Sequence, residues 1–114
     1  MSLGAQIAAR RNTQRRIIDV PEWGEDDVPL RLYCGPITAG DIDKLQRKHK
    51  NFLNDMTIAG MVDLIIHKAE MEDGAKAFTL EDKPHLMREP VAVISEVAGQ
   101  MFGETVDVEQ AEKN

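Results

Sequence analysis

The sequence predicts an α+β fold that is predominantly α-helical, with an N-terminal β-hairpin packed on a bundle of about four helices. Between residues 16 and 34, apolar and polar side chains alternate on either side of an acidic, glycine-containing turn, as in paired strands. From residue 38 onward, apolar side chains instead recur every three or four positions between capping and breaking residues. The length of 114 residues suits one globular domain, which we expect over residues 16–103.

Residues 1–15 precede the hairpin and are predicted to form either a short helix or a flexible basic arm. Good helix formers fill residues 3–14, but their apolar content is low, so a helix here would be marginal. A basic end of this kind is commonly solvated and is also a common contact point for partners. The first 18 residues contain no acidic side chain and four arginines, Arg10, Arg11, Arg15 and Arg16.

The predicted hairpin spans residues 16–35, with glycine and aspartate turn chemistry at 24–27. Pro21 and Pro29 remove backbone N–H donors, which is typical of edge strands, and no third strand is evident. Because a lone hairpin is only marginally stable in water, its apolar face must lie against helices. The residues expected on that face are Ile18, Val20, Val28, Leu30, Leu32 and Cys34.

Helices are predicted for most of the remaining domain. Thr38 and Thr79 each begin a Thr-x-x-Asp sequence that favours a helix start, and Pro90 separates the last two helices. The second of the four helices is the most hydrophobic and is expected at the centre of the core. Residues 104–114 are predicted to be a disordered acidic tail. The expected helices cover about 38–54, 57–72, 80–88 and 91–102.

Composition limits the classes of function. The net charge of −6 disfavours general nucleic-acid binding, which requires a basic surface, so no nucleic-acid partner is expected. No apolar run approaches the roughly 20 residues of a membrane span, so we expect no membrane partner. The single cysteine excludes an internal disulfide and is compatible with the reducing cytoplasm.

The chemical motifs favour a protein that is not an enzyme and has no cofactor. His67 and Glu70 have the spacing of a metal-binding pair, but a site needs three or four ligands and no second pair follows. Cys34 could be a nucleophile only if a base converged on it, and its place on the apolar strand face favours a buried thiol. The basic run at 44–50 could contact phosphate, although a solvated helix face is the simpler interpretation.

Five segments in a characteristic order carry a family resemblance over residues 5–103: "VPEWG", "VPLRLYCG", "ITAGDIDKLQ", "IAGMVDLIIHKA" and "MEDGAKAFTLED". In this order the chain resembles the small tail assembly chaperones of long-tailed bacteriophages and prophages. The resemblance implies binding of the tape-measure protein and recruitment of the tail tube protein in the host cytoplasm, with no place in the mature virion. The alternative is a small nucleic-acid-linked regulator with a helix-turn-helix-like pair at 38–71.

The expected client is a long helical chain with apolar stripes, so its binding surface should combine flexible apolar side chains with a basic rim. Trp23 could belong to this surface or could anchor the hairpin, and exposed hairpin edges could support a homo-oligomer. The candidate partner-binding residues are Trp23, Met56, Met61, Ile65, Met101, Arg10, Arg11, Lys44, Arg47 and Lys48.

Overall fold

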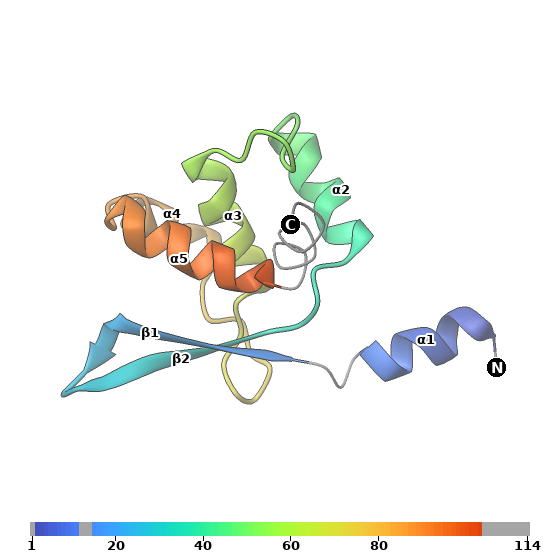
Figure 1. The fold of residues 1–114 in the computed structure, drawn as a ribbon, viewed down its shortest axis with the longest axis horizontal. Helices are drawn as coiled ribbons and strands as arrows, with labels where there is room; N and C mark the ends of the chain where they lie inside the picture. The colour runs from blue at the N-terminus through green and yellow to red at the C-terminus, as the bar shows by residue number, and fades with distance from the viewer. Residues whose placement is uncertain (1, 12–14, 104–114) are drawn as a thin grey trace, which may run out of the picture.

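The computed structural model describes residues 2–11 and 15–103, and its α+β architecture with an N-terminal hairpin is as predicted (Figure 1). The helices gather on one side of the two-stranded antiparallel sheet, while α1 lies beyond the start of β1. The predicted acidic tail at 104–114 lies outside the described residues. The elements are α1 (Leu3–Arg11), β1 (Arg16–Glu25), β2 (Val28–Cys34), α2 (Ala39–Lys48), α3 (Ile58–Lys68), the 3-10 turn η1 (Leu80–Asp82), α4 (Lys83–Leu86) and α5 (Val91–Met101).

The hairpin turns more tightly than predicted. Only Asp26 and Asp27 connect the strands, both with positive φ values of 49° and 66°, as the two-residue turns of twisted hairpins require. The strands pair regularly from Arg16↔Cys34 to Val20↔Leu30 and then shift register before the turn. The regular half buries one face, made of Ile18, Val20, Leu32 and Cys34.

Val28 is exposed, so the prediction that it faces the core is wrong. It lies beyond the register shift, in the half of the hairpin that extends past the helices (Figure 1). Strict alternation from Cys34 back to Val28 therefore overestimates the apolar face, and Leu30 is only partly buried.

One edge of the hairpin has a short third partner that the sequence did not indicate. The backbone N–H of Tyr33 donates to the Glu70 carbonyl at 2.8 Å, and the N–H of Glu70 donates back to Tyr33 at 2.8 Å. Glu70 also bridges to Lys76. A single-residue bridge has no periodicity, which explains why it escapes detection by pattern.

Helix α2 begins as predicted and ends earlier. Thr38 caps it through a capping box, in which the Asp41 N–H donates to Thr38 Oγ1 at 3.1 Å and the Thr38 N–H donates to Asp41 Oδ2 at 2.9 Å. The helix ends at Lys48 rather than near residue 54, and Asn51 has a left-handed φ of 58°. The turn that follows still buries Phe52, so its helical spacing from Leu45 misled the prediction.

Helix α3 begins at a Thr57 cap and ends at Lys68 rather than 72, because Glu70 leaves the helix to pair with Tyr33. The predicted helix at 80–88 is replaced by η1 and the single turn of α4, which Pro84 opens. Helix α5 follows Pro90 and packs against α3 on one side and β1 on the other. The core therefore lies between α3, α5 and the hairpin.

Phe52 joins the turn after α2 to this core. Its ring is fully buried, lies 6.2 Å from the Phe102 ring between centroids, and packs on Gly60 of α3. A Cβ at Gly60 would stand only 3.1 Å from the Phe52 ring, so the glycine permits this close approach.

We expect Phe52→Ala to lower the free energy of unfolding by about 3–5 kcal/mol, because it leaves a cavity in the core. The neighbouring Leu53 is exposed, and Leu53→Ala should change that free energy by less than about 0.5 kcal/mol. Urea unfolding followed by circular dichroism measures both values. Equal effects of the two substitutions would contradict this assignment of the core.

Candidate functional site

A groove of about 420 Å³ lies between α2, α3 and the segment at 76–80. Its wall combines apolar side chains with three lysines, and Leu80 stands on it with 71% of its surface exposed. We call it the lysine-rimmed groove. Its lining residues are Lys44, Leu45, Lys48, Asp63, Ile66, His67, Lys76, Phe78, Thr79 and Leu80.

Asp63 closes one end of the contact between α2 and α3. Its side chain is only 7% exposed, and its Oδ2 lies 2.5 Å from His49 Nε2 and 3.5 Å from Lys48 Nζ. Lys83 Nζ of α4 approaches Oδ1 to 3.0 Å. Burial alone would raise the pKa of the Asp63 carboxyl, but the hydrogen bonds from His49 and Lys83 outweigh it and lower the pKa below its ordinary value. The ionised carboxylate thus joins three helices.

Asp41 closes the other end. Its Oδ1 lies 2.8 Å from His67 Nε2, while its Oδ2 lies 2.8 Å from Lys68 Nζ and accepts from the Thr38 N–H. Burial opposes ionisation here too, but the hydrogen bond from Lys68 and those from Thr38 and His67 hold the pKa of the Asp41 carboxyl well below its usual range. Two carboxylates therefore fix α2 to α3, and His49 and His67 each bond one of them.

The residues considered for metal or nucleophilic chemistry do not converge. His67 bonds Asp41, whereas Glu70 lies 3.8 Å from Arg15. Within residues 2–11 and 15–103, no three His, Cys, Asp or Glu side chains are grouped as a metal site would require. Cys34 is buried, as its strand position predicts, and burial raises the pKa of its thiol, which disfavours the nucleophilic thiolate.

Four apolar candidates for partner contact lie in or against the core. Ile65 of α3 and Met101 of α5 are buried, so the prediction that they line an exposed surface is wrong. The two helices pack on each other, so their apolar faces form part of the core and do not line a groove. Met56 and Met61 are half-buried against the same core.

The basic candidates are divided among different surroundings. Lys44 and Lys48 line the lysine-rimmed groove, whereas Arg47 points to Asp43 at 2.9 Å. Arg10 is exposed on α1, and Arg11 ends that helix with a side chain outside the described part. Among the candidates whose side chains the structure describes, only Lys44 and Lys48 lie together at this groove.

Lys76, Phe78 and Leu80 of this groove were not predicted from the sequence. Their segment reaches α2 because Ala77 N–H donates to the Ala69 carbonyl at 3.0 Å, which turns the chain back along the end of α3. The available signal was local: an apolar residue on each side of Thr79, a helix-starting residue.

Trp23 lies between the hairpin and the segment that leads to α5. Its ring meets Phe78 edge-on, with centroids 5.8 Å apart, and its Nε1–H donates to Glu89 Oε1. The side chain is half-buried and has both a ring contact and a hydrogen bond, which are the contacts expected of an anchor.

Comparison of the chain with protein-family models, curated proteins and solved structures found no match. Across residues 2–11 and 15–103, no helix is both long and apolar enough to cross a bilayer.

The Asp41 contacts predict a specific pH dependence. Asp41→Asn should lower the free energy of unfolding near neutral pH by about 1–3 kcal/mol, since it removes charged hydrogen bonds. Folding lowers the pKa of this carboxyl, so its contribution is complete above the unfolded value of about 3.9 and is lost as pH falls through the folded value. The difference between wild type and variant should therefore shrink below about pH 4 in urea titrations.

Asp43→Asn provides the matched control on the same helix. Its exposed pair with Arg47 should contribute less than about 1 kcal/mol at any pH. A wild-type difference for Asp41→Asn that stays constant with pH would contradict the charged role of Asp41.

The anchor interpretation of Trp23 predicts a loss of stability. Trp23→Ala should lower the free energy of unfolding by about 2–4 kcal/mol, whereas Trp23→Phe keeps the ring contact and should cost about 1 kcal/mol for the lost hydrogen bond. Thermal and urea unfolding measure both. If Trp23→Ala left stability unchanged but abolished binding of a partner, Trp23 would be a contact residue instead.

Proposed function

We propose that this chain is a non-enzymatic, protein-binding tail assembly chaperone of a long-tailed phage or prophage. In this role it binds the tape-measure protein in the host cytoplasm and assists assembly of the tail tube around it. The observation that carries the proposal is the lysine-rimmed groove, whose apolar wall and positive rim lie beside α2. The ordered motifs of the sequence support the choice of client.

The groove fits an amphipathic helix with acidic flanks. Apolar side chains at i, i+3 and i+4 of such a helix would contact Ile66, Phe78 and Leu80. Acidic side chains beside that stripe would meet Lys44 and Lys76, which favours encounter and orientation. A groove of about 420 Å³ holds only a few side chains, so one site would bind a segment weakly and allow its release.

The nucleic-acid alternative gains no support from the α2–α3 pair. A helix that reads a DNA groove must expose one face, and α3 buries every residue from Val62 to Ile66. On α2, Arg47 and Lys48 lie beside Asp43 and Asp63, which reduces the positive charge available to phosphate.

Co-expression with segments of the tape-measure protein from the same phage tests the proposal. Wild type should keep a segment soluble and co-purify with it, and fluorescence anisotropy then gives its Kd. Lys44→Glu/Lys76→Glu and Leu80→Asp should each weaken binding by about tenfold or more, because they reverse the rim charge or remove an apolar contact.

Lys50→Glu and Leu53→Asp are the matched controls, because both residues are exposed on the turn after α2 and outside the groove. They should bind the segment as wild type does. Equal weakening by control and groove variants would place the contact elsewhere. A gene located among metabolic genes, rather than between a tail tube gene and a long tape-measure gene, would overturn the assignment to a phage.

A further inference from the structure

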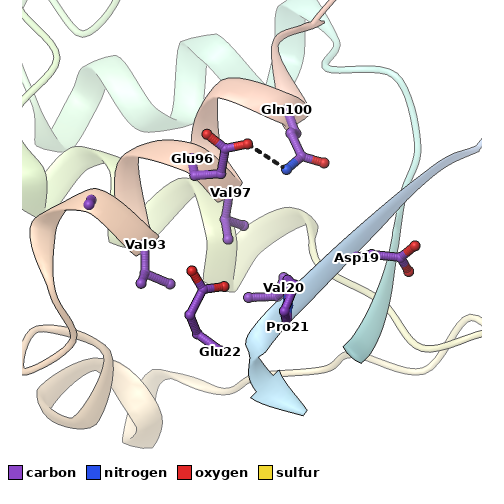
Figure 2. Close-up of a pocket in the computed structure, with 9 residues that line it drawn as sticks. Asp19, Val20, Pro21, Glu22, Val93, Glu96, Val97 and Gln100 are labelled. Carbon is purple, nitrogen blue, oxygen red and sulfur yellow. Dashed lines mark hydrogen bonds between the residues drawn. The ribbon is translucent and has the colours of Figure 1, made fainter. Parts of the chain in front are cut away.

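A second groove, of about 500 Å³, lies between β1 and α5 (Figure 2). Valines from both elements gather at its base, while acidic side chains stand around it. We call it the acidic groove. Its lining residues are Asp19, Val20, Pro21, Glu22, Ala92, Val93, Glu96, Val97 and Gln100.

The charge of the acidic groove has one sign. Three carboxylates line it, and none of its lining residues is basic. Asp19 is paired with Arg31 at 2.9 Å, whereas Glu22 and Glu96 stand on opposite walls of the groove and are both exposed (Figure 2). A ligand that combines apolar and positively charged side chains would complement both the base and the rim.

Helix α1 has this combination, and its apolar side chains are exposed. All its residues from Leu3 to Arg10 are exposed, including Leu3 at 67% and Ile7 at 46%, which share one face at i, i+4 spacing. The helix contains no acidic residue and ends in Arg10 and Arg11. A nine-residue helix whose apolar side chains are exposed is marginal in water, so a surface that buries Leu3 and Ile7 would stabilise α1.

We infer that α1 of one copy of this chain docks in the acidic groove of a second copy. Leu3 and Ile7 cover the valine base, and the positive end of the helix lies between Glu22 and Glu96. The lysine-rimmed groove is excluded as the receptor for α1 because its rim would repel a basic helix. The inference goes beyond the proposed function and does not depend on it.

The contacts of Arg15 at the start of β1 indicate that α1 docks on a second copy rather than on its own chain. Arg15 donates to the carbonyls of Met71 at 3.3 Å and Glu72 at 2.9 Å, and its guanidinium lies 4.6 Å over the Tyr33 ring. These contacts hold the start of β1 against Tyr33 of β2 and the segment at 71–72. In Figure 1, α1 continues beyond the start of β1 and away from α5, so it does not cover the groove of its own chain.

Sedimentation velocity of the full-length chain over a range of concentrations tests the inference. Wild type should associate, and two variants should each weaken association by about tenfold or more: Leu3→Asp/Ile7→Asp in the helix and Glu22→Arg/Glu96→Arg in the groove. All four side chains are exposed, so circular dichroism should show the wild-type fold. Arg10→Glu/Arg11→Glu provides an independent helix variant that reverses charge alone.

Mixing the variants separates this mode from other dimers. The helix variant Leu3→Asp/Ile7→Asp keeps an intact groove, and the groove variant keeps an intact helix, so the mixture should form a heterodimer that neither forms alone. Arg10→Glu/Arg11→Glu should associate with Glu22→Arg/Glu96→Arg, because the charges are then reversed on both sides. Leu53→Asp and Asp55→Arg/Glu81→Arg are the controls, with exposed residues outside the groove.

Three results would overturn the inference. One is a wild-type chain that stays monomeric at every concentration. This result would also be seen if α1 folded onto the acidic groove of its own chain. The second is undiminished association of the helix and groove variants. The third is a mixture of variants that fails to associate. If the wild-type chain self-associated as expected but did not bind the tape-measure segments, the proposed function would be wrong and this inference would stand.

Discussion

The arrangement of this protein depends on covering one face of a two-stranded hairpin. Such a sheet is marginal alone, and here four fully buried side chains, Ile18, Val20, Leu32 and Cys34, make its apolar face part of the core. Helix α5 covers β1 and packs in turn on α3. Enclosed by these neighbours, α3 buries the side chains of Val62, Leu64, Ile65 and Ile66. Both proposed contact surfaces therefore lie at the margins of the body rather than on its most hydrophobic helix.

Helix α2 is attached mainly by polar contacts rather than by apolar packing, and this leaves the lysine-rimmed groove open beside it. Leu45 is its only buried residue, so apolar packing contributes little to its attachment. The carboxylates of Asp41 and Asp63 supply fixed contacts at its two ends instead, each satisfied by a histidine and a lysine. A buried carboxylate without such partners would be costly, so the pairs also specify one register between α2 and α3. The side of α2 toward Phe78 and Leu80 stays open.

Short-range signals in the sequence predicted the parts of this structure that are short-range in origin. Thr38 and Thr57 cap helices through neighbouring N–H groups, and alternation placed Ile18 and Cys34 inside. The features that were predicted wrongly depend on contacts between residues far apart in the sequence. Phe52 is buried by its packing on Gly60 and Phe102 rather than by a longer α2, and the segment at 69–78 is shaped by its bridge to Tyr33. Since that bridge positions one wall of the groove, the sequence pointed only to the wall on α2, with Lys44 and Lys48.

The net charge of −6 is spread unevenly over the surface, as the two grooves show. Acidic residues line the groove between β1 and α5, lysines line the groove beside α2, and the arginines of the first 18 residues lie at the opposite end of β1 from its turn. A basic helix is attracted to the first groove and repelled by the second, so self-association and client binding would use separate surfaces. Copies joined through α1 would then present several lysine-rimmed grooves to one long client, and weak single contacts would add by multivalency. Charge segregation is thus the feature that makes the two proposed interactions compatible on a chain of 114 residues.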